Sequence, residues 1–272
     1  MLETASSRMS NRECIIPLAQ NEIHLWFANY DEIDDERMHD AYRALFNEQE
    51  KRQELQFYFA KDRRRYLVTR ALVRTVLSRY QSVSPKDWIF STNAHGRPEI
   101  ANAGMSGARL SFNISHTHSL IVLGVTRGRA LGVDVENICT RAVSIDIADR
   151  FFSPAEVAVL AGVPPSQQQA RFFEYWTFKE SYIKARGMGL SIPLDKFSFH
   201  YPHDGAVEIV IHPELKDDPA RWQFWQFRPM PEYLVAICAE RADPQSPAIV
   251  VRRAIPMGVE TMIAPTFSRT SG

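Results

Sequence analysis

The sequence predicts an α+β fold of two similar lobes with a ligand site between them. Its composition, 45% hydrophobic and 24% charged residues in a chain of 272, is that of a globular protein with a sizeable core. Each half contains helical segments, a short strand after an Asp, and a pair of strands that ends in an apolar run. This order repeats after roughly a hundred residues, which indicates an internal duplication. We expect lobes over residues 21–130 and 131–240.

Charge and cysteine usage exclude several classes of protein. Lys plus Arg and Asp plus Glu number 32 each, so no net field draws the chain toward nucleic acid or an anionic membrane. The three cysteines, Cys14, Cys139 and Cys238, have neither ligand nor disulfide spacing. The sequence contains no secretory signal and no apolar run of transmembrane length. We therefore expect a cytoplasmic protein with no nucleic-acid or membrane partner.

The first lobe begins with a strand and continues with helices. Residues 1–20 are polar and are expected to be loose, and alternation over 22–28 predicts a strand. From 34 to 80 the apolar spacing predicts at least two helices. The same segment carries five arginines: Arg63, Arg64, Arg65, Arg70 and Arg74. They suit a phosphate ligand, although ordinary exposure on a helix surface is an equally good interpretation.

A turn and two buried strands follow. A short strand is predicted at 88–90, and the turn after it contains Gly96 and Arg97. Gly96 lets the backbone approach a ligand closely and Arg97 can reach a phosphate, although the same residues also make a simple turn. Apolar runs at 119–126 and 131–135 then predict a pair of strands joined by a short turn.

Two acidic residues end the second of these strands. Alternate side chains of a strand share a face, so Asp134 and Glu136 point the same way while Val133 and Val135 point into the core. Carboxylates held that close require a cation, such as a divalent metal, or a shared proton. Because Asp-x-Glu is a short pattern, two solvated acids at a strand end are the alternative.

The second lobe contains a helix whose start is well marked. Ser153 as N-cap, Pro154 at the first position and Glu156 at the third form a capping-box start. A longer helix is predicted from about 167 to 186, ending at Gly187.

On the longer helix Trp176, Glu180 and Lys184 are spaced four apart and share one face. Taken alone, the Glu180 and Lys184 pair is typical of an exposed helix surface. The remaining predicted elements are a hairpin over 194–212, strands at 222–228 and 233–239, and a C-terminal extension over 241–272 that is strand-like at 248–254 and otherwise loose.

Four motifs in order carry a family resemblance. They are Gly96-Arg97-Pro98, Phe112-Asn113-Ile114-Ser115-His116, Gly132-Val133-Asp134-Val135-Glu136, and WTFKESYIK from Trp176 to Lys184. Together they resemble the Sfp-type 4′-phosphopantetheinyl transferases over about residues 20–240. The resemblance implies two α+β lobes related by pseudo-twofold symmetry, with the active site between them, in one monomeric chain. It also implies transfer of the phosphopantetheine arm of coenzyme A to a serine of an apo carrier protein, with Mg²⁺ and release of adenosine 3′,5′-bisphosphate.

The resemblance assigns roles to individual residues. Asp134, Glu136 and Glu180 match the family's Mg²⁺ ligands, and Glu180 is the expected base. The expected coenzyme A contacts are Gly96, Arg97, Pro98, Ser115, His116 and Lys184, with Lys179 close by. Lys184 and His116 are expected to act in catalysis beside Glu180.

The resemblance weakens at 48–54, where relatives have basic residues for the 3′-phosphate and this chain is mixed in charge. Lys51, Arg52 or the arginines at 63–65, with Arg65 among them, are the candidates. A noncatalytic module that binds a carrier protein or coenzyme A is one alternative, and another Mg²⁺ phosphoryl-transfer enzyme or hydrolase is a second. The sequence leaves open whether the acyl or peptidyl carrier serves fatty acid, polyketide or nonribosomal peptide synthesis.

Overall fold

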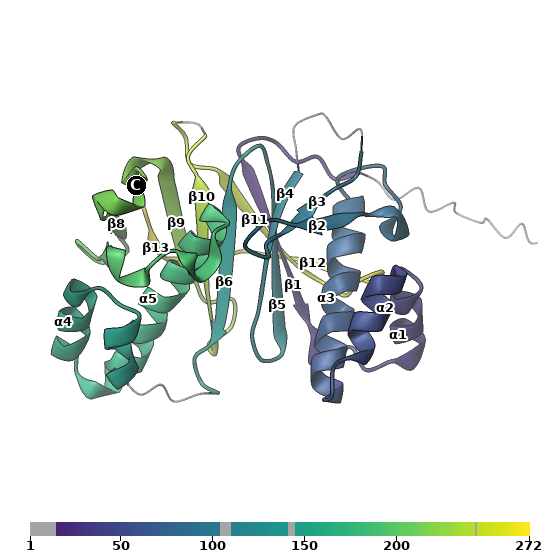
Figure 1. The fold of residues 1–272 in the computed structure, drawn as a ribbon, viewed down its shortest axis with the longest axis horizontal. Helices are drawn as coiled ribbons and strands as arrows, with labels where there is room; N and C mark the ends of the chain where they lie inside the picture. Colours follow the sequence, from purple (N-terminus) through teal and green to yellow (C-terminus); the bar gives the residue numbers. More distant parts are fainter. Residues whose placement is uncertain (1–14, 104–109, 141–144, 243) are drawn as a thin grey trace, which may run out of the picture.

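Two β-sheets lie face to face at the centre of the molecule, with helices on the outer side of each (Figure 1). The structure, a computed structural model, describes residues 15–103, 110–140, 145–242 and 244–272. One apolar cluster lies between the sheets, and two others lie between each sheet and its helices. The result is a helix–sheet–sheet–helix sandwich, which confirms the predicted α+β class.

The first half of the chain forms one sheet and its helices. Its elements are β1 (Glu22–Asn29), α1 (Glu36–Arg43), α2 (Glu48–Leu55), α3 (Ala60–Ser78), β2 (Phe90–Thr92), β3 (Pro98–Ile100), β4 (Leu110–His116) and β5 (Leu120–Arg127). β5 pairs antiparallel with both β1 and β4. β2 and β3 form a separate hairpin.

The second half repeats this order. Its elements are β6 (Leu131–Asn137), α4 (Pro154–Gly162), α5 (Pro165–Arg186), β7 (Phe197–His200), β8 (Glu208–Ile211), β9 (Trp222–Phe227) and β10 (Tyr233–Glu240). β10 pairs antiparallel with both β6 and β9, and β7 and β8 form a separate hairpin. In each half the last strand therefore lies between the first strand and the one before it.

Local signals predicted the helices of the second half correctly. Ser153 and Glu156 form the capping box of α4, with the Ser153 side chain accepting from Glu156 N–H and the Glu156 carboxylate accepting from Ser153 N–H. α5 ends at Gly187, whose φ of 68° is the left-handed conformation that glycine favours. Both features depend on residues close in sequence.

Two strand predictions in the middle of the chain need correction. The segment at 88–90 is not a strand throughout, because Trp88 is buried in the core with its indole N–H bonded to Ser78 Oγ at 2.9 Å and β2 starts only at Phe90. The apolar runs at 119–126 and 131–135 are strands, β5 and β6, but they belong to different sheets. The turn between them therefore carries the chain from one lobe to the other.

The C-terminal segment is more ordered than predicted. The expected strand at 248–254 is β11 (Ala248–Ala254), which lies parallel to β1. Beyond it the prediction of a loose chain is wrong, because β12 (Glu260–Ile263) pairs with β11 and β13 (Phe267–Thr270) pairs with β9. Of the polar start at 1–20, positions 1–14 lie outside the described residues. In the described ranges no helix is both long and apolar enough to cross a membrane.

Gly132 allows β6 and α5 to approach each other closely. A Cβ atom placed on Gly132 would collide with the backbone of Ser181 and Ala185 in α5. The first glycine of the Gly132-to-Glu136 motif therefore has a packing role. It sets the distance between the strand and the helix that carry the predicted acidic residues.

We expect Gly132→Ala to destabilise the protein by about 1–3 kcal/mol or more, because the added methyl overpacks a backbone contact that cannot relax. Gly162→Ala is the matched control, since a Cβ there meets nothing within 4 Å. It should leave the free energy of unfolding unchanged or raise it by up to about 1 kcal/mol. Urea denaturation of both variants is the measurement, and equal stability would refute the close contact.

Candidate active site

The two sheets meet at the edges of β4 and β6, where side chains of one strand bind the backbone of the other. Asn113, Ser115 and Thr117 alternate along β4 and its end, and each accepts a hydrogen bond from a backbone N–H of β6. The donors are Val133 (2.8 Å, to Asn113), Val135 (3.3 Å, to Ser115) and Asn137 (3.1 Å, to Thr117). This junction brings the end of the Phe112-to-His116 motif beside the Asp134 and Glu136 pair.

Four of the predicted residues converge at this junction. Lys184 Nζ, from α5, lies 2.6 Å from Asp134 Oδ1 and 2.9 Å from Ser115 Oγ. Ser115 Oγ also donates to Asp134 Oδ1 at 2.9 Å. Glu136 accepts a hydrogen bond from the Trp176 indole N–H at 3.1 Å. Trp176 and Lys184, on one face of α5, thus contact the two acids of β6.

The carboxylates here outnumber the positive charges. Burial, with the negative charge of Asp134, raises the pKa of Glu136 to about 7. Burial and Asp134 likewise raise the pKa of Glu180 to about 7, although Lys184 opposes the change. Asp134 Oδ2 is buried and has no hydrogen-bond partner among the described residues. Three carboxylates with one lysine between them fit a hard divalent cation.

The acids are not yet arranged around a common point. Among the described residues, no three or more His, Cys, Asp or Glu side chains are grouped closely enough to hold a metal ion. The ammonium group of Lys184 lies 2.6 Å from Asp134 Oδ1 and occupies the position of a cation at this oxygen. Asp134 Oδ2, which Lys184 does not contact, is the oxygen of this carboxylate that is left for a metal.

His116 lies at the end of β4, exposed to solvent beside the junction. Surrounding protein atoms and the positive charge of Arg65 lower the pKa of its imidazole. Arg65 therefore lies near the site, with Nη2 3.1 Å from Asp62. Lys51 is on the exposed surface of α2, paired with Glu48 at 2.8 Å.

The arginine patch predicted on α3 is only partly a surface feature. Arg74 is fully buried and binds Glu50 at 2.6 Å, and Arg70 pairs with the same carboxylate. Both guanidinium groups lie over the ring of Phe90. Arg74 thus belongs to the core and Arg70 to its edge, because a buried glutamate requires cations.

The prediction that Lys179 lies near coenzyme A is wrong. Its side chain is fully buried on the far side of α5, 2.7 Å from Glu156. Its ammonium also donates to the carbonyls of Leu194 at 2.7 Å and Phe197 at 2.6 Å, so its three protons are used inside the lobe. The residue next to Glu180 points away from the site because helix neighbours lie on different faces.

The turn at 93–98 has the predicted shape, with Gly96 at φ 83° and Pro98 at the start of β3. Arg97 does not extend into solvent. Its guanidinium donates to the carbonyls of Lys184 and Ala185, each at 3.2 Å, and to that of Leu131 at 3.3 Å. The hairpin thus contacts the end of α5.

Several residues of the site were not singled out from the sequence. Asn113 and Thr117 join the sheets, and Asn93 donates to the carbonyl of Gly187 at 2.8 Å. The alternation Asn-x-Ser-x-Thr over 113–117 was the available signal, because polar side chains repeating every second residue mark one face of a strand.

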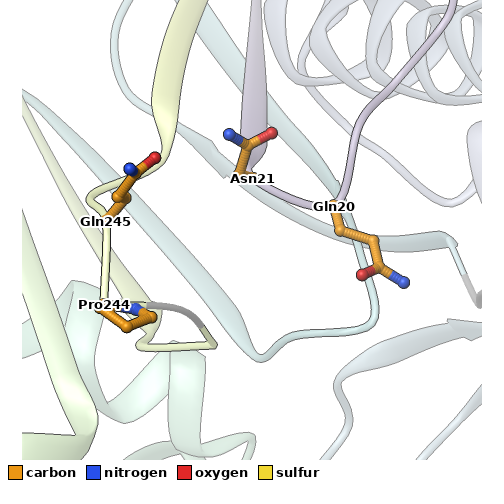
Figure 2. Close-up of a pocket in the computed structure, with 4 residues that line it drawn as sticks. All are labelled: Gln20, Asn21, Pro244 and Gln245. Carbon is orange, nitrogen blue, oxygen red and sulfur yellow. The ribbon is translucent and has the colours of Figure 1, made fainter.

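A separate cavity of about 420 Å³ opens between the starts of β1 and β11, lined by Gln20, Asn21, Pro244 and Gln245 (Figure 2). Its lining residues contain amides and a proline and no titratable group. It offers none of the charges that phosphate chemistry needs. The junction of β4, β6 and α5 is therefore the candidate active site.

Replacing the buried Lys179 should destabilise the fold without changing the affinity for coenzyme A. Lys179→Met leaves Glu156 buried and unpaired, which costs about 3–5 kcal/mol. Lys196→Met is the control, because the pair with Glu214 is 36% and 64% exposed and is worth about 1 kcal/mol or less. Chemical denaturation measures the difference, and calorimetry on the folded fraction measures coenzyme A binding. A weaker affinity with unchanged stability would restore the original assignment.

Comparison with known proteins identifies the family. The family model for the 4′-phosphopantetheinyl transferase superfamily matches residues 130–238, and that for the 4′-phosphopantetheinyl transferase N-terminal region matches 34–127. The 4′-phosphopantetheinyl transferase Sfp of Bacillus subtilis is 35% identical over 69% of this chain and 79% of the relative. HetI of Nostoc sp., also a 4′-phosphopantetheinyl transferase, is 32% identical over 65% and 73%. A Thermotoga maritima holo-[acyl-carrier-protein] synthase structure overlaps 43% of this chain and 66% of its own, with 16% identity and a TM-score of 0.35. The chain belongs to the 4′-phosphopantetheinyl transferase superfamily.

Proposed function

We propose that this enzyme transfers the 4′-phosphopantetheine arm of coenzyme A to a serine of an apo acyl or peptidyl carrier protein. The observation that carries the proposal is the convergence of Asp134, Glu136, Glu180 and Lys184 at the lobe junction. A noncatalytic binding module has no need for three clustered carboxylates that share one lysine. The family relationship supports this class of reaction, and the cluster of charges supports the lobe junction as its site.

Asp134, Glu136 and Glu180 would hold Mg²⁺. When bound, the ion neutralises the pyrophosphate of coenzyme A and keeps positions open for its oxygens. The buried, unpartnered Oδ2 of Asp134 supports this assignment. Lys184, whose ammonium lies beside Asp134 and Ser115, would pair with the pyrophosphate.

We assign the coenzyme A contacts to Ser115, His116 and Lys184 and to Gly96 and Pro98 of the turn. Arg97, also predicted as a contact, is instead directed at the carbonyls of α5 and β6. Arg65 is the preferred candidate for the 3′-phosphate, because its charge already acts on His116. Lys51 stays a second candidate. Each of these groups lies in the first lobe or faces it from α5, so the nucleotide would bind across the junction.

The transfer is one displacement at phosphorus. The carrier serine oxygen forms a bond to the β-phosphorus of coenzyme A, and the bond from that phosphorus to the bridging oxygen breaks. Adenosine 3′,5′-bisphosphate leaves with the electron pair. Glu180 takes the serine proton, a role that its raised pKa of about 7 suits near neutral pH. The chain's contribution is positioning and charge stabilisation.

We further propose that the lobes at 21–130 and 131–240 are related by pseudo-twofold symmetry and that the enzyme acts as a cytoplasmic monomer. The repeated strand order supports the symmetry. So does a pair of equivalent acids: Glu50 and Glu156 each close a capping box, and each pairs with a buried cation of the following long helix.

Intact mass spectrometry of an apo carrier protein incubated with this protein, coenzyme A and Mg²⁺ tests the reaction. We expect a gain of one phosphopantetheinyl group that is lost with EDTA or with a serine-to-alanine carrier. Asp134→Asn should slow the transfer by roughly a hundredfold or more, because the charge stabilisation that a metal provides is worth several kcal/mol.

Asp204→Asn is the matched control for this variant, because Asp204 is exposed in the turn between β7 and β8. It should transfer at the wild-type rate. Coenzyme A binding without transfer to any carrier would favour the binding-module alternative. A metal-dependent hydrolysis of coenzyme A without transfer would favour a hydrolase.

Metal binding should be stronger at high pH than at low pH. Because the pKa values of Glu136 and Glu180 are about 7 in the folded protein and ordinarily 4.5, the folded protein holds their protons more tightly. Their contribution to stability is full below about pH 4.5 and is lost as the pH rises through 7. Mg²⁺ competes with those protons, so it should raise Tm more at pH 8 than at pH 5.5.

Thermal denaturation with and without Mg²⁺, at matched ionic strength, measures this difference. Glu180→Gln should reduce the Mg²⁺-dependent rise in Tm at pH 8. An equal rise in Tm at both pH values would contradict a site made of these carboxylates.

A further inference from the structure

We infer that Arg97 and Asn93 form a brace between the lobes that positions the two elements of the active site, α5 and β6. The inference deepens the proposed function and rests on it, because it assigns Arg97 a positioning role instead of a coenzyme A contact. It starts from three hydrogen bonds that one guanidinium group makes across the junction, and from a fourth made by the neighbouring asparagine.

The contacts of Arg97 reach both elements that carry the acids. Nη1 donates to the carbonyls of Lys184 and Ala185 at the end of α5, and Nη2 donates to the carbonyl of Leu131, the first residue of β6. α5 carries Glu180 and Lys184, and β6 carries Asp134 and Glu136. A single side chain of the first lobe therefore ties together the strand and the helix on which the chemistry depends.

Asn93 adds a second contact from the same turn. Its Nδ2 donates to the carbonyl of Gly187 at 2.8 Å. Its Oδ1 stays within the turn and accepts from the N–H groups of His95 at 2.9 Å and Arg97 at 3.0 Å. The asparagine thus both shapes the turn and attaches it to the helix end.

Helix chemistry explains why this attachment is favourable. The last carbonyls of an α-helix lack partners within the helix, and a positive charge there also interacts well with the helix dipole. Gly187 lets the turn come close, since a Cβ on it would lie 3.2 Å from Arg97 Nη1, which is tighter than an ordinary contact. Its φ of 68° also disfavours other residues.

The brace fixes the position of Lys184 relative to β6. The backbone carbonyl of Lys184 is held by Arg97, while its ammonium reaches Asp134 and Ser115. A shift of the helix end moves that ammonium relative to β6. Misplacement of a catalytic group by about 1 Å can cost on the order of a hundredfold in rate.

Asn93→Asp isolates the brace. It keeps Oδ1 for the turn, removes the donor to Gly187, and places a carboxylate oxygen against a carbonyl. Asn102→Asp is the matched control, because Asn102 also accepts from one backbone N–H (Ile89, 2.8 Å) and donates to one carbonyl (Asp87, 2.8 Å), but within its own lobe. The full-length chain carries each substitution.

Two readouts are measured, one independent of activity. Hydrogen exchange of peptides covering the end of α5 and the start of β6 should be about tenfold faster in Asn93→Asp than in wild type or Asn102→Asp. The kcat per folded molecule at saturating coenzyme A, well below the unfolding temperature, should fall on the order of tenfold in Asn93→Asp only. Arg97→Lys should show the same loss, because one ammonium cannot replace a guanidinium that spans three carbonyls.

The outcomes separate the brace from a direct ligand contact. If Asn93→Asp behaves like Asn102→Asp in both readouts, the brace is refuted. If Arg97→Lys keeps full kcat, or if Arg97→Met only weakens coenzyme A affinity, Arg97 is a ligand contact and the inference is wrong. A wild-type chain that modifies no carrier contradicts the proposed function, while faster exchange in Asn93→Asp still supports the brace.

Discussion

The structure depends on side chains of β4 that satisfy the backbone of β6. Asn113, Ser115 and Thr117 take the place of a neighbouring strand, and without them buried N–H groups of β6 would lack partners, at about 1–3 kcal/mol each. The same contact puts Ser115 against Asp134 and Lys184. The joint between the lobes and the reactive site are therefore one arrangement of atoms, and a change in either affects both.

The buried carboxylates of this molecule fall into two groups that differ in how well cations balance them. Within the lobes their charge is balanced: Glu50 has Arg70 and Arg74, and Glu156 has Lys179 and two backbone N–H donors. At the junction it is not, since Lys184 serves Asp134 while Glu136 and Glu180 lack a full counter-charge. Balanced clusters stabilise a fold, and an unbalanced cluster is suited to take up a cation and a charged substrate.

Helix ends and helix faces, which depend on residues nearby in the chain, could be predicted from the sequence. The burial of side chains, which depends on residues distant in the chain, could not. The start of α4 at Ser153, the end of α5 at Gly187 and the shared face of Glu180 and Lys184 each follow from residues within one or two turns. The burial of Lys179 and Arg74 depends on glutamates more than twenty positions away, so neither could be separated from a surface cation. The family motifs supplied the proposed metal ligands and the class of reaction, which periodicity could not.

The position of β11 has a consequence for synthesis of the chain. β1 pairs with β5 on one side and with β11 on the other, and β11 begins at Ala248. While the chain emerges from the ribosome, the first lobe can form its helices and the sheet strands β1, β4 and β5. One edge of β1 stays open until β11, more than two hundred residues after β1, has been made. An open apolar edge strand is a site for wrong pairing. The nascent first lobe therefore exposes an edge of β1 that the finished protein covers with β11.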